Sequence, residues 1–476
     1  MDDSEELGTF RDRLATISEE GKRVWVYPKK PKGKLYNKRG IVAYLLLIFV
    51  FAAPFVKIRG DQMLLFNIIE RKFVIFGVIF WPQDFYLFVL SMITLIVFTV
   101  LFTVIYGRLF CGWVCPQTIF MEFVYRQVEY LVEGNNSQQR KLDERGWDFD
   151  KIWRKSLKHL IFFAISILTI TTFLAYILGS DPLLKILTEG PSLHWAGFVG
   201  LLAFSAAHYF VFAKFREQVC IIVCPYGRLQ GVLLDHNSIQ VSYDYKRGEP
   251  RGKHNPLEER QNAGKGDCID CGSCEIVCPT GIDIRNGSQL ECINCTACMD
   301  ACNAVMHRIN KPKGLIRYAS ERTIAEGSPL KVNARVIFYS VILTGLLLLV
   351  AYLFSVRTDV EATVLRMSGS MYQEYDSVHY SNIYTIQVVN KTRKELPVRL
   401  ELVKPEGDIK MMGDSLIVRK GQLGTANFLV VVRKDQIKTS DTKVIFRVLS
   451  GDREIQKVKS TFVGPNALDY HQTDHK

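Results

Sequence analysis

Five stretches of this 476-residue chain are long and apolar enough to cross a membrane as helices. A sixth apolar run, Phe73–Trp81, is too short to span, and we expect a re-entrant or interfacial piece there. The first forty residues are polar and charged, so no cleavable signal peptide is expected. The fold class is therefore an α-helical membrane protein. The predicted spans are Ile41–Val56, Phe85–Tyr106, Leu160–Leu178, Ala196–Ala213 and Val336–Val356.

The formal net charge of +12 would suit a nucleic-acid partner, but its distribution indicates a membrane topology instead. Ten basic residues precede the first span, and the segment between spans two and three is also basic. The connection between spans three and four carries only Lys185. This is the positive-inside pattern, which places the N-terminus in the cytoplasm and residues after Val356 outside.

Eight of the twelve cysteines lie within residues 268–302, in two runs of C-x2-C-x2-C-x3-C. This spacing is typical of two [4Fe–4S] clusters, in which the fourth cysteine of each run binds the other cluster. Zinc fits a compressed run poorly, and a reducing cytoplasm disfavours disulfides. Pro279 follows the first run, whereas Asn303 takes that place in the second. The predicted ligand sets are Cys268, Cys271, Cys274 and Cys302 for one cluster, and Cys292, Cys295, Cys298 and Cys278 for the other.

The other four cysteines form two C-x3-C-P motifs, Cys111 with Cys115 and Cys220 with Cys224. Each motif follows a span, which indicates an internal duplication, and an arginine (Arg108 or Arg216) lies just upstream. Spacing i, i+4 predicts both thiols on one helix face. Together the pairs would make a four-thiolate site for copper or an additional cluster. The alternative is that they are small buried residues at helix ends.

Two further features complete the interpretation. His208, within the fourth span, is a candidate ligand to haem or copper or a contact to quinone, but a hydrogen bond to a neighbouring helix is the favoured interpretation. The tail has short alternating strands and no cysteine, which predicts an immunoglobulin-like β-sandwich that contacts a partner. The predicted domains are 1–39, a cytoplasmic basic segment; 40–235, four spans; 236–335, a cytoplasmic ferredoxin-like domain; 336–356, the fifth span; and 357–476, the periplasmic sandwich.

The motifs "FCGWVCPQTIF" and "CIIVCPYGRLQG", with the double cysteine run and the tail, resemble the cytochrome c oxidase accessory protein family known as CcoG, FixG or RdxA. The resemblance covers nearly the whole chain. It implies a bacterial inner-membrane oxidoreductase that reduces Cu(II) to Cu(I) for cbb3-type oxidase maturation, with the oxidase assembly machinery and copper chaperones or transporters as partners. The eight clustered cysteines would be the relay, and Cys111, Cys115, Cys220 and Cys224 the acceptor-side thiols.

Two alternatives to this function stay open at this point. One is a quinol-linked relay that feeds another respiratory enzyme, as in the membrane ferredoxins of nitrate systems. The other is a non-enzymatic assembly factor whose clusters sense redox state or stabilise the fold. The sequence identifies neither the electron donor, nor the side on which copper is reduced, nor the oligomeric state.

Overall fold

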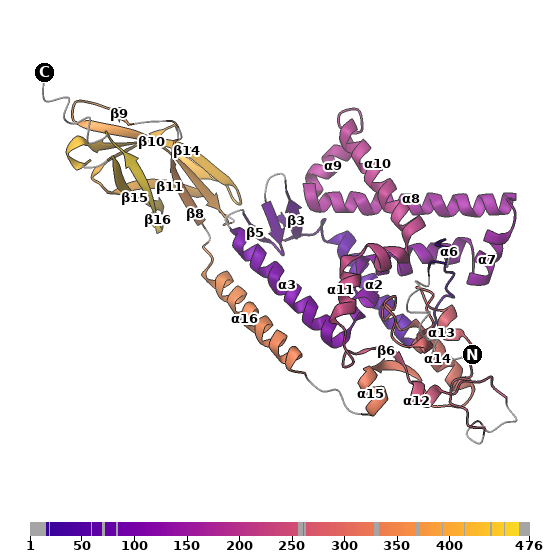
Figure 1. Ribbon diagram of the computed structural model, residues 1–476. Helices are drawn as coiled ribbons and strands as arrows, with labels where there is room; N and C mark the ends of the chain where they lie inside the picture. Colours follow the sequence, from indigo (N-terminus) through magenta and orange to yellow (C-terminus); the bar gives the residue numbers. More distant parts are fainter. Residues whose placement is uncertain are drawn as a thin grey trace. The chain divides into compact units, whose positions relative to one another are not determined.

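The computed structural model describes residues 16–18, 20–58, 60–68, 72–81, 84–255, 260, 263–327, 333–358, 360–367, 369, 372–392, 394–413, 415–437, 440–451 and 453–465. The chain divides into two compact units (Figure 1). Unit 1 comprises Met1–Glu70 and Phe88–Leu349, and unit 2 comprises Arg71–Leu87 and Val350–Lys476. Unit 1 contains all twelve cysteines, so the candidate chemistry belongs to it.

In the described part of the chain, five helices are long and apolar enough to cross a membrane, in agreement with the predicted number of spans. Four of these helices begin earlier than predicted, two of them by more than a helical turn. The first begins at Lys34 because the Asp300 carboxylate accepts hydrogen bonds from the backbone N–H groups of Leu35 and Tyr36, at 3.3 and 2.8 Å. The third begins at Phe149, where Asp148 is the N-cap. The five helices are α2 (Lys34–Ala52), α3 (Phe85–Tyr106), α8 (Phe149–Leu178), α10 (Trp195–Phe210) continued by η3 (Val211–Phe215), and α16 (Ala334–Val356).

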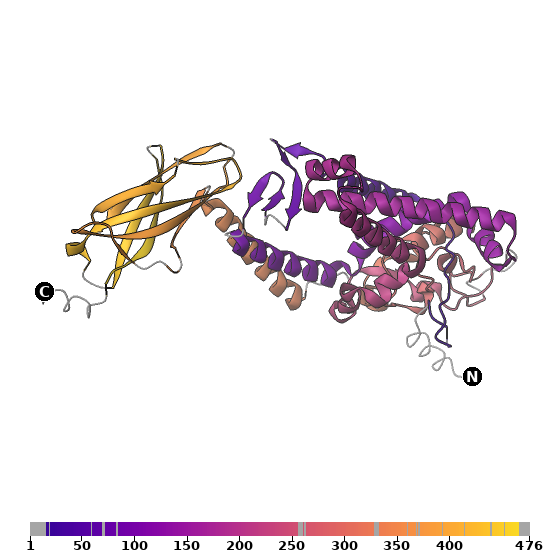
Figure 2. The same ribbon diagram turned by 90° about the horizontal axis from the view of Figure 1, so that it is seen from above.

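Shorter elements connect these helices and form the surroundings of the cysteines. In Figures 1 and 2, α10 runs against α8, and their contact is part of the membrane-domain core. The connecting elements are β1 (Lys57–Ile58), β2 (Asp61–Gln62), β3 (Leu64–Asn67), α4 (Leu109–Trp113), α5 (Pro116–Ile119), η2 (Phe120–Tyr125), α6 (Arg126–Val132), α7 (Asn136–Glu144), α9 (Ser180–Glu189), η4 (Val219–Val223) and α11 (Pro225–Leu233).

The ferredoxin-like part of unit 1 is closed by a short antiparallel pair, β6 (Gln240–Tyr243) with β7 (Ile316–Ala319). Between these strands the chain folds back over an apolar cluster that includes Met306, Leu315 and five of the cysteines. This places both cysteine runs in one small core. Its remaining elements are α12 (Tyr245–Gly248), α13 (Ser273–Ile276), η5 (Ile284–Asn286), α14 (Ala297–Arg308) and α15 (Glu321–Glu326).

The apolar run Phe73–Trp81, predicted to be too short to span and to form a re-entrant or interfacial piece, folds as β-structure. The segment contains an antiparallel hairpin, β4 (Lys72–Ile75) with β5 (Val78–Phe80). Phe76 and Gly77, at its turn, both have positive φ angles, 49° and 77°. A tight turn with two such residues reverses the chain after four residues and leaves too little apolar length for a helix.

Unit 2 contains the predicted β-sandwich, in which every pairing of neighbouring strands is antiparallel (Figure 2). One sheet has the order β12-β14-β10-β8, with β9 on β10, and the other β13-β11-β15-β16. Aromatic side chains with no exposed area, including Tyr384, Phe428 and Phe446, fill the space between the sheets. The strands are β8 (Val360–Arg366), β9 (Gln373–Glu374), β10 (His379–Asn390), β11 (Leu396–Lys404), β12 (Gly407–Met412), β13 (Leu416–Val418), β14 (Leu423–Arg433), β15 (Asp441–Ser450) and β16 (Arg453–Val463).

Buried ions fasten the start of α3 to the sandwich within unit 2. Asp84, whose side chain is 3% exposed, pairs with Arg357 at 2.7 Å and with Lys391 at 2.7 Å. The Arg357 guanidinium also lies over the Phe80 ring, 4.9 Å from its centroid. These contacts hold β5, the first turn of α3 and the first part of the sandwich together.

Candidate metal centres

Two cavities in the ferredoxin-like part are each lined by four or more cysteines. The first is lined by Cys268, Cys271, Cys274 and Cys302, which we call the first cysteine site. The second is lined by Cys278, Cys292, Cys295 and Cys298, which we call the second cysteine site, and Cys274 borders it too. The structure thus brings together the crossed sets expected from the sequence. The thiols surround cavities, as ligands of a cubane cluster must, because each thiolate binds a different iron.

The backbone winds in the same way in both runs. Asp270 and Asn294 occupy equivalent positions and have φ angles of 50° and 53°. Gly272 and Thr296 are equivalent as well, with φ angles of 64° and 66°. A positive φ is costly for a β-branched residue such as Thr296 and persists only where the surroundings impose it. The repeat is therefore one of conformation as well as spacing.

The missing proline of the second run has a structural explanation. Asn303 lies inside α14, which continues for five residues beyond it, and a proline there would remove a helical hydrogen bond. Instead, its side-chain oxygen accepts a hydrogen bond from the backbone N–H of Gly314 at 2.9 Å. The first run ends in a turn after Cys278, so Pro279 is compatible there.

The first cysteine site lies at the surface and its cations are neutralised. Cys271 is exposed. Arg285 lines the cavity and pairs with Asp283 and Asp270. Arg247, whose charge acts on the Cys302 thiol, pairs with Asp267 at 2.7 Å.

The second cysteine site is enclosed by unit 1. Burial raises the pKa of the Cys295 thiol to about 11, and the nearby Arg39 guanidinium acts in the opposite direction. Arg108 is 6% exposed, and its guanidinium donates hydrogen bonds to the carbonyl oxygens of Leu290 and Gly227. Burial lowers the pKa of Arg108, while Cys111 and Cys292 raise it, so this cation lies between the second cysteine site and the first C-x3-C-P motif.

The two thiols of a C-x3-C-P motif do not share a continuous helix, which corrects the expectation from i, i+4 spacing. Cys115 is the N-cap of α5 and Cys224 the N-cap of α11, with ψ angles of 124° and 112°. In each motif the proline is the first helical residue, and the residue before a proline is driven to an extended conformation. The helical conformation is therefore interrupted at the second cysteine of each motif, so the two thiols do not lie on one continuous helix.

The four C-x3-C-P thiols nevertheless gather in one place. Burial, followed by the proximity of Cys115, Cys111 and Cys224, raises the pKa of the Cys220 thiol to about 12. The Cys111 thiol lies within hydrogen-bonding distance of the Gln230 side chain on α11, with a donor–acceptor distance of 3.4 Å. The duplicated halves therefore meet at these thiols. Among the described residues, no three His, Cys, Asp or Glu side chains, either here or at the two cysteine sites, converge on a point where one metal ion would sit.

Cys111 also touches the second cysteine site. It packs against the apolar cluster of Val277, Ile293, Cys295 and Ala297. The next residue, Gly112, allows this approach: a Cβ atom there would lie 2.3 Å from the Ile293 carbonyl oxygen and 3.0 Å from that of Asn294. Sequence spacing alone did not predict this contact.

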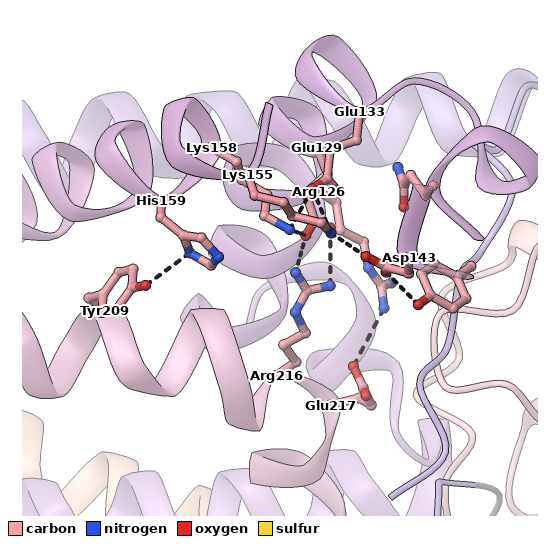
Figure 3. Close-up of polar contacts among 12 residues, drawn as sticks. Arg126, Glu129, Glu133, Asp143, Lys155, Lys158, His159, Tyr209, Arg216 and Glu217 are labelled. Carbon is pink, nitrogen blue, oxygen red and sulfur yellow. Dashed lines mark hydrogen bonds and ion pairs between the residues drawn. The ribbon is translucent and has the colours of Figure 1, made fainter. Parts of the chain in front are cut away.

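A buried ion-pair network adjoins the second cysteine site and was missed by sequence reasoning (Figure 3). Arg126, whose side chain is 3% exposed, pairs with Glu122 and with Glu217 at 3.6 Å. It also donates a hydrogen bond to the carbonyl oxygen of Pro279, next to Cys278, at 2.9 Å. Glu217 in turn pairs with Arg23 at 3.0 Å. The network therefore fixes one wall of the second cysteine site to the membrane domain.

The same network links the two halves of the duplication. Arg216, upstream of the second motif, donates to Glu129 on α6 of the first half at 3.0 Å. Lys158 on α8 pairs with Glu133 at 2.8 Å and with Glu129 at 3.5 Å. Arg108, upstream of the first motif, donates a hydrogen bond to the Gly227 carbonyl oxygen of the second half. The two upstream arginines thus each bind the opposite half.

His208 hydrogen-bonds neighbouring elements, in line with the favoured interpretation. Its Nδ1 lies 3.2 Å from the Ser166 hydroxyl oxygen on α8 and 3.4 Å from the Tyr125 hydroxyl oxygen. His159 likewise meets the Tyr209 hydroxyl oxygen at 2.9 Å (Figure 3). Neither contact singles out a haem, copper or quinone.

Three protein-family profiles match the chain. A 4Fe-4S binding domain matches residues 88–134, which contain the first C-x3-C-P motif. A 4Fe-4S dicluster domain matches residues 215–321, which contain the second motif and both cysteine runs. The immunoglobulin-like fold at the C-terminus of FixG matches residues 350–465.

Curated relatives show similarity along most of the chain. Protein RdxA of Cereibacter sphaeroides is 33% identical over 79% of this chain and 82% of its own length. Protein RdxB of the same organism is 33% identical over 79% of this chain and 81% of its own length. The nitrogen fixation protein FixG of Rhizobium meliloti is 36% identical over 63% of this chain, and the match spans 58% of FixG.

Proposed function

Because this chain belongs to the FixG and RdxA family of membrane iron–sulfur proteins, we propose that it reduces Cu(II) to Cu(I) at its C-x3-C-P thiols. The chain is an iron–sulfur electron-transfer protein, and clusters held by its cysteines supply single electrons. Copper is the proposed substrate: each Cu(II) accepts one electron and becomes Cu(I), and an external low-potential donor restores that electron.

The contact of Cys111 with the second cysteine site is the observation that supports this proposal. Cys111 packs beside Ile293 and Cys295, and Gly112 lets the two backbones meet. An electron leaving the second cysteine site therefore reaches the C-x3-C-P thiols across a short, apolar contact. Thiolate ligands favour Cu(I) over Cu(II), so these thiols suit the product of the reduction.

An orientation and a partner follow from the same proposal. The cysteine sites face the cytoplasm by the positive-inside rule, and the sandwich lies on the other side. The sandwich contains no cysteine, and we propose that it contacts the cbb3-type oxidase assembly machinery or a copper carrier. Reporter fusions at the two ends of the chain test the orientation.

The test is an anaerobic titration of the purified, reduced protein with Cu(II). Cluster absorbance and Cu(I) formation, detected with a specific chelator, are followed together. One Cu(I) per electron lost is expected, and a variant with serine at Cys111, Cys115, Cys220 and Cys224 should lose this reactivity with its iron content intact. Clusters that stay reduced in the presence of Cu(II) would remove copper as the acceptor.

Iron content separates copper handling from an additional cluster at the C-x3-C-P thiols. Two [4Fe–4S] clusters correspond to about eight iron atoms per chain, and a third would raise this to about twelve. We expect about eight. A loss of about four iron atoms in the four-serine variant would instead assign those thiols to a cluster.

A further inference from the structure

A buried arginine of the first membrane helix has most of its hydrogen-bonding capacity free. Arg39 in α2 is 1% exposed. Its Nε donates a hydrogen bond to the Gly112 carbonyl oxygen at 2.6 Å, and its guanidinium lies over the Phe123 ring, 5.1 Å from the centroid. Among the described residues, neither Nη1 nor Nη2 has a hydrogen-bond partner, although both atoms are buried.

A guanidinium in this position needs a counterpart. Buried polar groups are almost always paired, and a buried charge without a partner is strongly destabilising. The nearby carboxylate of Glu122 is engaged by Arg126. Within the described part of the chain, Arg39 takes part in no ion pair. The counterpart is therefore a group that the described part of the chain does not supply.

The contacts of Arg39 show where that group lies. The carbonyl that it binds belongs to Gly112, whose Cα approaches the backbone of Ile293 and Asn294. Cys295, which follows Asn294 in the chain, lines the second cysteine site. Cys111, the residue before Gly112, packs against Ile293 and Cys295. The free guanidinium ends thus lie beside the Cys295 side of this site.

We propose that Arg39 donates its free N–H groups to sulfur at the second cysteine site and makes this the site of higher reduction potential. Hydrogen bonds to cluster or ligand sulfur and nearby positive charge both favour the reduced state. Arg39 is therefore a tuning residue that directs electrons from the first site to the second. The inference rests on iron–sulfur clusters at the cysteine sites and is independent of copper as the acceptor.

The test is a potentiometric titration of the purified holoprotein, followed by electron paramagnetic resonance. In Arg39→Gln the higher of the two reduction potentials should fall. At a fixed ambient potential, the ratio of reduced to oxidised second site should decrease at least tenfold, which corresponds to about 59 mV for a one-electron couple. Lys38→Gln is the matched control because Lys38 is the exposed neighbour on the same helix, and it should leave both potentials unchanged. Equal potentials in wild type and Arg39→Gln would overturn the proposal.

A second measurement covers the case in which Arg39→Gln loses its cluster. The wild-type protein is labelled with 15N-arginine, and nitrogen couplings to the reduced second site are recorded by pulsed resonance. A coupling is expected, and it should disappear in Arg39→Lys, which keeps the charge but not the guanidinium. Absence of any arginine coupling in wild type, or its persistence in Arg39→Lys, would contradict the proposal. Because neither measurement involves copper, failure here is distinct from failure of the proposed function.

Discussion

The two cysteine sites share one spacing and one backbone winding, yet their surroundings differ. At the first site, Cys271 is exposed, and the cations Arg247 and Arg285 are neutralised by carboxylates. At the second site, Arg39 is buried without an ion-pair partner among the described residues, and Cys111 packs against the wall. In the proposed function, the exposed first site would receive electrons from solution, and the enclosed second site would pass them to the C-x3-C-P thiols. Environment, not ligand spacing, sets the difference.

The strongest test of this comparison removes one site at a time. Serine at Cys292, Cys295 and Cys298 should reduce the iron content from about eight to about four and abolish copper reduction, because the second site is the one next to Cys111. Cys271→Ser should damage only the first site. When a strong chemical reductant reaches the second site directly, copper reduction should persist in Cys271→Ser. Iron analysis and the chelator assay check both variants. An equal loss of copper reduction in the two variants would mean that the two sites do not have different roles.

The second-largest effect is expected from the ion-pair network that holds the second site. Burial opposes ionisation of Glu129, but Arg216 and Lys158 outweigh it and lower its pKa to about 2. Glu129→Gln leaves Arg216 buried without its partner, at a cost of about 3–5 kcal/mol. Thermal unfolding of the detergent-solubilised holoprotein at pH 7 should show this loss.

The sign of the pH dependence follows from the lowered pKa. Glu129 contributes its full stabilisation above the ordinary glutamate pKa of 4.5 and loses it as the pH falls from there toward about 2. Wild type should therefore lose stability on acidification over that interval, whereas Glu129→Gln should lack this step. Asp270→Asn, at an exposed carboxylate of the first site, is the control and should cost about 1 kcal/mol or less. A loss of stability in Asp270→Asn as large as that in Glu129→Gln would mean that the ion pairs at the two sites do not differ in their contribution.

A smaller but more specific effect is expected at the contact between Cys111 and the second site. In Gly112→Ala, the new Cβ would meet the Ile293 carbonyl oxygen at 2.3 Å, so the two backbones must separate. A displacement of about 1 Å can slow a geometry-dependent step by up to about a hundredfold. Stopped-flow oxidation of the reduced protein by Cu(II) should be slowed by about that factor or less, with iron content unchanged. The control is Gly146→Ala, since a Cβ at Gly146 meets nothing within 4 Å. Equal oxidation rates in the two variants would mean that the contact at Gly112 does not affect electron transfer.

Much of this organisation could be predicted from local patterns in the sequence. The cysteine spacing repeats within about forty residues, and the apolar spans are continuous, so both are legible without tertiary knowledge. The break at Cys115 could also have been recognised, because Pro116 follows it directly. The hairpin within Phe73–Trp81 was missed because its two strands are apolar and its turn residues, Phe76 and Gly77, carry only a weak turn signal.

The features that distinguish the two sites lie in long-range contacts. Arg39 looks like one more residue of a positive-inside segment, and only folding places it against Gly112, 73 positions away. Asp300 caps α2 by accepting a hydrogen bond from the backbone N–H of Tyr36, which lies 264 positions earlier in the chain. No helix-start signal near Lys34 could reveal this cap. Gly112 is one glycine among 33, and its role depends on where Ile293 lies. Spacing predicts ligands, whereas the tuning of those ligands depends on the fold.

The smallest expected effect is the counterpart of the Arg39 test at the first site. Arg247→Gln removes a cation near Cys302, but Asp267, which balances that cation, then keeps Lys311 as a partner at 3.2 Å. Each substitution removes one positive charge, but water at the exposed surface of the first site screens this loss, whereas Arg39 is buried. The lower of the two reduction potentials should shift by less than the roughly 59 mV expected for Arg39→Gln. A shift as large at the first site would mean that proximity of an arginine, and not its lack of a carboxylate partner, controls the potential. The direction of electron flow could then not be inferred from the difference in pairing between the two sites.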